Sequence, residues 1–123
     1  MFADPQKNIE QFGLQPGQKV ADFGAGSGFY SFAAAQAVTS KGTVYSIDVQ
    51  QDLLAKLTNE ARRQGISNIE TIWGDAERLG ATKLADGSMD AVIISNLLFQ
   101  LEDKPGAAKE ALRILKKGGR ALV

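Results

Sequence analysis

Apolar positions along the chain fall into short runs rich in β-formers and longer stretches with helical spacing, and the two kinds alternate. The short runs predict strands at residues 19–23, 43–48, 69–73, 89–95 and 120–123. The longer stretches predict helices at residues 5–12, 29–38, 52–64 and 104–116. In the last helix the side chains expected to face inward are Ala108, Ala111, Leu112 and Leu115.

This alternation predicts an α/β protein with a Rossmann-like, doubly wound parallel sheet of strand order 3-2-1-4-5. Helices on both faces would complete a three-layer sandwich, and the unbroken apolar run at residues 91–94 fits a strand covered on both sides. Ligands of such sheets bind beyond the carboxyl ends of the strands, where the strand order reverses. The loop after the first strand, Asp48, the segment after the third strand and the pair Ser95 and Asn96 all fall at that edge.

Composition narrows the function without naming it. The length favours one domain, residues 1–123, and 14 basic residues balance 14 acidic ones, so no nucleic-acid partner is indicated. The chain has no cysteine and no histidine, which removes disulfides, thiolate metal sites and the commonest general base; we expect no metal. No apolar run is long enough to span a membrane and no secretory signal is visible, so a cytoplasmic location is expected.

A glycine-rich loop is the strongest candidate for binding chemistry. Gly24, Gly26 and Gly28 lie between the first strand and the next helix, where glycine permits a sharp turn and close approach of a ligand. A plain tight turn needs fewer glycines. The dinucleotide fingerprint G-x-G-x-x-G/A fails because Phe29 stands at its last glycine, and the loop has no P-loop lysine motif. Asp22 would repel a pyrophosphate and attract a ligand that carries an ammonium group.

Several segments resemble, in the family's order, the class I S-adenosylmethionine-dependent methyltransferases. The matching segments are VADFGAGSGFYS, VYSID, IWGDAERL, MDAVIISNLLFQL and LKKGGRALV. The last three resemble the branch of small methyltransferases that includes the ubiquinone and menaquinone biosynthesis enzymes. The resemblance covers nearly the whole chain. It implies S-adenosylmethionine as cofactor, S-adenosylhomocysteine as product and methyl transfer by in-line displacement.

Within this resemblance, Asp22 faces the methionine amino group of the cofactor; the structural alternative is capping of N–H groups in the turn. Asp48 ends the second strand, and its acceptor-only carboxylate can take both ribose hydroxyls; the alternative is a helix N-cap. Val49 either presses on the adenine or belongs to the core. The loop residues expected at the cofactor are Gly24, Ala25, Gly26, Gly28, Phe29 and Tyr30, of which the two aromatics wall the site or pack in the core.

The remaining cofactor contacts are expected after the third and fourth strands. The resemblance implies that Asp75 accepts from the adenine amine, while the backbone N–H of Ala76, beside Gly74, meets the ring; a turn aspartate is the alternative. Ser95 and Asn96 are expected at the methionine end, with Asn96 facing the methyl acceptor or serving only as a cap. No catalytic residue is assigned, because in-line displacement mainly needs donor and acceptor to be aligned.

Two functions stay open: a working methyltransferase, and a cofactor-binding domain with little or no turnover. A nicotinamide oxidoreductase is a third, which Phe29 opposes. Members of the resembled family continue past a fifth strand, whereas the fifth strand predicted here reaches residue 123. Strands 6 and 7 are therefore expected to be absent, in a form that is either naturally minimal or truncated. A fifth strand at an exposed edge is a template for pairing with a second chain, from which we expect a homodimer. The sequence does not indicate the methyl acceptor.

Overall fold

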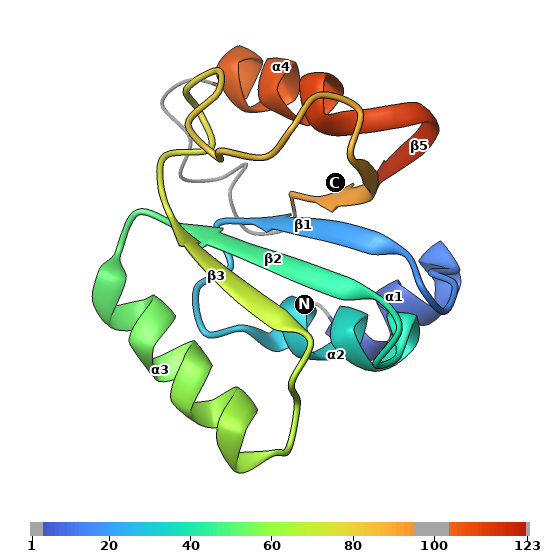
Figure 1. Cartoon of the computed structure of the whole chain (residues 1–123), viewed down its shortest axis with the longest axis vertical. Helices are drawn as coiled ribbons and strands as arrows, with labels where there is room; N and C mark the ends of the chain where they lie inside the picture. Colours follow the sequence, from blue (N-terminus) through green and yellow to red (C-terminus); the bar gives the residue numbers. More distant parts are fainter. Residues whose placement is uncertain (1–3, 95–103, 123) are drawn as a thin grey trace.

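The computed structural model describes residues 4–94 and 104–122. In chain order its elements are α1 (Pro5–Phe12), β1 (Lys19–Phe23), α2 (Phe29–Val38), β2 (Thr43–Asp48), α3 (Gln51–Arg63), β3 (Ile69–Trp73), β4 (Met89–Ile93), α4 (Lys104–Ile114) and β5 (Leu115–Leu122) (Figure 1). All the strand pairings are parallel, and they join one sheet of order β3-β2-β1-β4-β5. The predicted fold class and strand order are confirmed.

Helices cover both faces of this sheet and complete the three predicted layers (Figure 1). Because successive side chains of a strand point to opposite faces, β1 contributes to two separate cores. Its Val20 packs with Ile9 of α1 and Ala34 of α2 on one face. Its Ala21 belongs to the core on the other face, which α4 closes with Ile114.

The inward face of α4 differs from the prediction. Its buried positions are Ala107, Glu110, Ala111 and Ile114. Of the side chains predicted to face inward, only Ala111 is buried in the helix: Leu112 is 74% exposed, Ala108 is exposed, and Leu115 belongs to β5. The buried face of α4 is therefore rotated about the helix axis relative to the predicted face. The reason is that Glu110, a charged residue that an apolar pattern places in solvent, points inward and is hydrogen-bonded there.

The fifth strand begins earlier than predicted, at Leu115 rather than at residue 120. Leu115 pairs with Met89 and Arg120 with Ala91, and the register shifts between these two pairs. Gly118 and Gly119, which lie between the predicted helix and the predicted strand, are therefore part of β5. A bulge of this kind absorbs extra residues in one strand while the ladder continues on either side.

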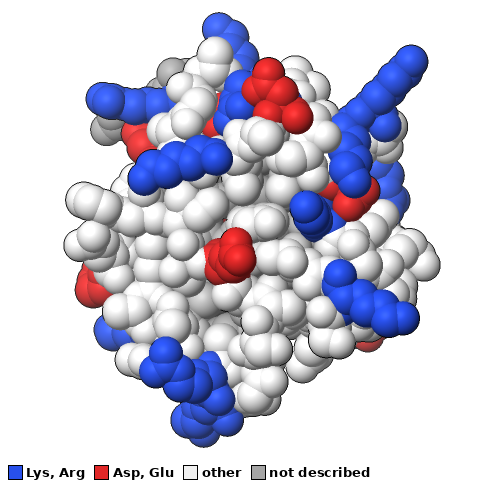
Figure 2. Space-filling view, in the orientation of Figure 1, with Lys and Arg blue, Asp and Glu red and all other residues white. Residues whose placement is uncertain are grey.

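Charged side chains of both signs occur on the face of the molecule that Figure 2 shows. Figure 2 shows lysine and arginine side chains scattered over the visible face, with acidic side chains among them. This distribution agrees with the equal numbers of basic and acidic residues, 14 of each. Within the described ranges, no helix is long and apolar enough to cross a membrane.

Candidate functional site

The loop between β1 and α2 needs its glycines for backbone conformation and for space. Gly24, Gly26 and Gly28 have φ values of 69°, 55° and 91°, in the left-handed region that other residues enter at a cost. The N–H group of Gly24 donates to the carbonyl of Ile47 at 2.8 Å, which ties the loop to the end of β2. A Cβ atom at Gly28 would approach Leu57 to 3.0 Å, so the loop also lies close against α3.

Asp22, on the strand that leads into this loop, is a buried carboxylate that is 1% exposed. Its Oδ2 atom accepts from the Ser31 hydroxyl at 2.7 Å, and the Ser46 hydroxyl lies 2.6 Å from that of Ser31. Its Oδ1 atom has no hydrogen-bond partner among the described residues. Burial raises the pKa of Asp22 from 3.8 to about 7; the bond from Ser31 opposes this shift, and the nearby charge of Asp48 adds to it.

Asp48, at the end of β2, accepts hydrogen bonds from the backbone of two segments. Its Oδ2 atom accepts from the N–H of Gly26 at 3.0 Å, and its Oδ1 atom accepts from the N–H of Gln50 at 2.9 Å. The second of these bonds is local, as expected for an aspartate before a helix, but the first joins β2 to the glycine loop. Each carboxylate oxygen has a further lone pair, so Asp48 can still accept from a ligand.

The segment after β3 lies beside the same edge. The N–H of Gly74 donates to the backbone carbonyl of Asp48 at 3.0 Å. The Oδ1 atom of Asp75 accepts from the N–H of Glu77 at 2.9 Å. This bond is the one expected of a turn aspartate, the structural alternative for this residue. Ala76 is buried at 5% exposure and packs in the core cluster on the α4 face.

The apolar residues expected at the site divide into two groups. Val49 is 57% exposed and Phe29 67% exposed, so both side chains are available at the surface rather than packed in the core. Tyr30 is 6% exposed, and its hydroxyl accepts from Asn8 of α1 at 2.7 Å, which supports the packing alternative for its side chain. Trp73 donates to the carbonyl of Val49 at 2.8 Å and braces the segment after β2.

The structure thus brings most of the predicted site residues to one edge of the sheet, with the exception of the Tyr30 side chain. Ser95 and Asn96 lie outside the described residues. Sequence reasoning missed Ser31 and Ser46, which connect α2 and β2 to the buried Asp22. The only signal for them was two polar residues within otherwise apolar elements.

These residues fit a cofactor that has a cationic end and a ribose. A buried carboxylate oxygen without a partner is unfavourable unless a donor reaches it, and an ammonium group is a suitable donor. The unpartnered Oδ1 of Asp22 meets this condition, while the remaining acceptor capacity of Asp48 suits hydroxyl groups. The fold and this edge define the class: a Rossmann-like nucleotide-cofactor-binding domain.

A family model described as a methyltransferase domain matches residues 14–123. The chain therefore belongs to the methyltransferase domain family. It is 40% identical over 111 residues to an arsenite methyltransferase of Aquipseudomonas alcaligenes, covering 86% of this chain and 32% of that protein. It is 35% identical over 116 residues to the ubiquinone/menaquinone biosynthesis C-methyltransferase UbiE of Haemophilus ducreyi, covering 94% and 44%. The chain spans less than half the length of these two relatives.

Solved structures agree with this assignment. A SAM-dependent methyltransferase from Aquifex aeolicus superimposes with a TM-score of 0.82 at 29% identity, covering 92% of this chain and 58% of that one. An arsenic(III) S-adenosylmethionine methyltransferase from Chlamydomonas reinhardtii gives 0.78 at 35% identity, covering 87% and 38%. These comparisons confirm the predicted family, fold and cofactor class, that of the S-adenosylmethionine-dependent methyltransferases.

Proposed function

We propose that this chain binds S-adenosylmethionine at the edge formed by the glycine loop, Asp48 and Asp75, and holds it for methyl transfer. The observation that carries the proposal is the buried Asp22 Oδ1 atom, which has no partner among the described residues and belongs to the strand that leads into the glycine loop. The chemistry of the bound cofactor is that of a sulfonium, which donates its methyl group to a nucleophile by in-line displacement.

Each part of the cofactor has a residue suited to it. Asp22 accepts from the methionine ammonium group, and Asp48 accepts from the ribose hydroxyls. Asp75 accepts from the adenine amine, and the backbone N–H of Ala76 meets the ring. Val49, which is 57% exposed, covers one face of the adenine. Gly24, Ala25, Gly26 and Gly28 let the backbone approach the cofactor, and Phe29 walls it.

The residues assigned to the cofactor act by binding and orienting it. The chain has no histidine, and no general base is assigned. Alignment of donor and acceptor lowers the barrier of a displacement by several kcal/mol, so catalysis does not require such a base. The two curated relatives named above act on chemically unrelated acceptors, arsenite and quinone precursors by their names, so their similarity selects no acceptor for this chain.

Transfer of a labelled methyl group tests the activity directly. The protein is incubated with methyl-labelled S-adenosylmethionine and fractionated cell extract, and the label is followed into products. If the chain is an active methyltransferase, the wild-type protein gives labelled product and the Asp48→Ala variant does not. Cofactor binding without any labelled product would instead identify a binding domain with little or no turnover.

Self-association through β5 is a further part of the proposal. β5 lies at one edge of the sheet, and an edge strand offers unpaired N–H and C=O groups to a second chain. Light scattering over a wide concentration range tests this, because a monodisperse monomer throughout would contradict it. A cytoplasmic location stays a prediction from the sequence.

A further inference from the structure

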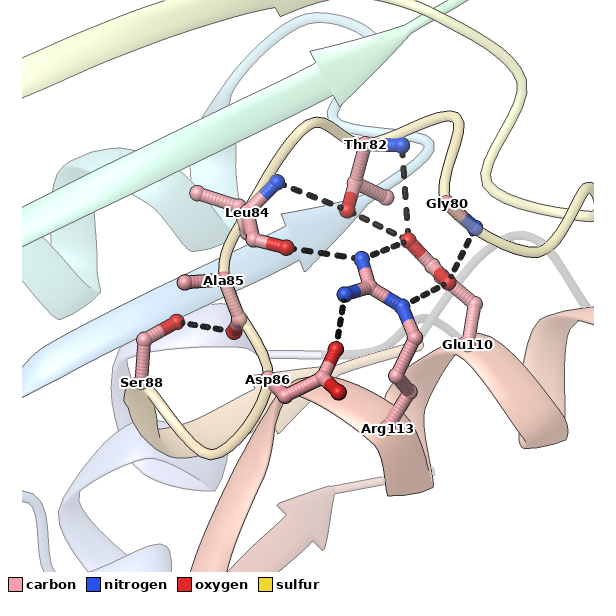
Figure 3. A network of polar contacts seen from close by, with 8 residues as sticks. All are labelled: Gly80, Thr82, Leu84, Ala85, Asp86, Ser88, Glu110 and Arg113. Carbon is pink, nitrogen blue, oxygen red and sulfur yellow. Dashed lines mark hydrogen bonds and ion pairs between the residues drawn. The ribbon is translucent and has the colours of Figure 1, made fainter.

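An ionic cluster built on the buried Glu110 joins α4 to the long loop between β3 and β4 (Figure 3). Glu110 of α4 is fully buried. Its Oε1 atom accepts from the N–H of Gly80 at 2.7 Å, and its Oε2 atom accepts from the Thr82 hydroxyl at 2.5 Å. Burial opposes the ionisation of Glu110, but the bonds from Arg113, Gly80 and Thr82 outweigh it and lower the pKa to about 2.

Arg113, one turn further along α4, extends the cluster across the loop. Its guanidinium binds Glu110 through Nε and Nη2, both at 2.8 Å. The same group donates to Asp86 at 2.6 Å and to the carbonyl of Leu84 at 2.7 Å. As Figure 3 shows, the loop wraps around this pair of side chains from Gly80 to Asp86. A charged network in which every member is satisfied holds a segment in one arrangement.

The part of the loop held in this way supports the adenine end of the cofactor site. Gly80 and Thr82, both bound by Glu110, flank Ala81. The carbonyl oxygen of Ala81 lies so close to Gly74 that a Cβ atom added to Gly74 would be 2.7 Å from this oxygen. Gly74 in turn donates to the carbonyl of Asp48 and precedes Asp75. A continuous path of packing and hydrogen bonds therefore runs from Glu110 to the two aspartates.

We propose that Glu110 and Arg113 are positioning residues that set the place of Asp75 and so the recognition of the adenine amine. The inference rests on the proposed binding of S-adenosylmethionine. Glu110 does not contact the cofactor; it acts through Ala81 and Gly74. Loss of its contacts lets the loop shift away from Gly74, which weakens the contact that distinguishes adenine from a base without the amine.

The test compares S-adenosylhomocysteine with S-inosylhomocysteine, in which a carbonyl replaces the adenine amine. The wild-type protein should prefer S-adenosylhomocysteine by roughly tenfold or more, the value of one hydrogen bond to a charged group. In Glu110→Gln this ratio should fall to within about twofold of unity. The ratio is measured by titration of Trp73 fluorescence, since this residue is the only tryptophan and lies next to Gly74. General loss of stability would lower both affinities but leave their ratio unchanged.

The chain offers a matched control in Glu60, which forms the same kind of pair with Arg63 on α3, at 2.6 Å, away from the loop. Glu60→Gln should keep the wild-type ratio. Thr82→Val removes the hydroxyl that donates to Glu110 and should lower the ratio without removing a charge. Thr82→Ser keeps a hydroxyl and should keep the wild-type ratio. This second pair keeps the test valid if Glu110→Gln fails to fold.

The outcomes separate this inference from the proposed function. An unchanged ratio in folded Glu110→Gln and Thr82→Val, with normal discrimination in the wild type, would overturn the positioning role alone. A wild-type protein that binds neither compound would instead refute the proposed cofactor. A ratio that falls in Glu110→Gln and in Thr82→Val but not in Glu60→Gln supports the inference.

Discussion

At the scale of single residues, the candidate site is built around a carboxylate that is unfavourable until a ligand arrives. Asp22 is buried on β1, and one of its oxygens has no partner among the described residues. Its raised pKa, about 7, means that the folded protein binds a proton more tightly than the unfolded chain does. The stability of the free protein should therefore fall as pH rises from about 3.8 to 7, and stay lower above that range.

Replacement of Asp22 by asparagine should separate stability from binding. At pH 8 the variant should be more stable than the wild type by on the order of 1–3 kcal/mol, because a buried charge is removed. It should also bind S-adenosylmethionine at least tenfold more weakly, because the ammonium group loses an ionic partner. Denaturant unfolding at pH 5 and pH 8, with calorimetry at pH 8, measures both. Asp52→Asn, at an exposed position on α3, is the control and should change neither.

A second prediction separates two reasons for glycine at Gly28 of the glycine loop, by comparison with Gly17 in the turn before β1. Gly28 and Gly17 have similar φ values, 91° and 87°, but only Gly28 has side chains close to the place of a Cβ atom. Alanine at Gly17 should cost about 1 kcal/mol from backbone strain alone. Alanine at Gly28 should cost about 2–4 kcal/mol, since overpacking adds to the strain. Equal free energies of unfolding for the two variants would show that the contact with Leu57 does not matter.

At the scale of elements, sequence patterns succeeded where burial follows hydrophobicity and failed where it follows ion pairing. The first three predicted strands and α2 match the structure in their bounds, because β-formers and glycine turns mark them clearly. The prediction of the inward face of α4 was wrong because Glu110 is buried and paired with Arg113, and no apolar pattern indicates a buried charge. Its partners Gly80 and Thr82 lie far away in the sequence, in a loop without a regular pattern.

The corrected face of α4 makes a direct prediction. Ile114 is fully buried, so Ile114→Ala should lower the free energy of unfolding by about 2–4 kcal/mol. Leu112 is 74% exposed, so Leu112→Ala should change it by no more than about 0.5 kcal/mol. Chemical denaturation of the two variants measures the difference. The reverse order would restore the face predicted from sequence and contradict the observed packing.

At the scale of the whole molecule, strand order is what assembles the site. Asp22 lies near the end of β1, Asp48 ends β2 and Asp75 follows β3. The order β3-β2-β1 brings the ends of these strands to neighbouring positions. This convergence was predictable because parallel strands end at the same edge. The hydroxyl pair of Ser31 and Ser46 was not predictable, since it depends on how closely α2 approaches β2.

The most direct test of the central claim is calorimetric titration of the protein with S-adenosylhomocysteine and with NAD. The proposed site predicts binding of S-adenosylhomocysteine and no binding of NAD. It also predicts that Asp48→Asn weakens binding of S-adenosylhomocysteine by roughly 1–3 kcal/mol, because the ribose hydroxyls lose a charged acceptor. Binding of NAD without S-adenosylhomocysteine, or an Asp48→Asn variant with unchanged affinity, would contradict the account.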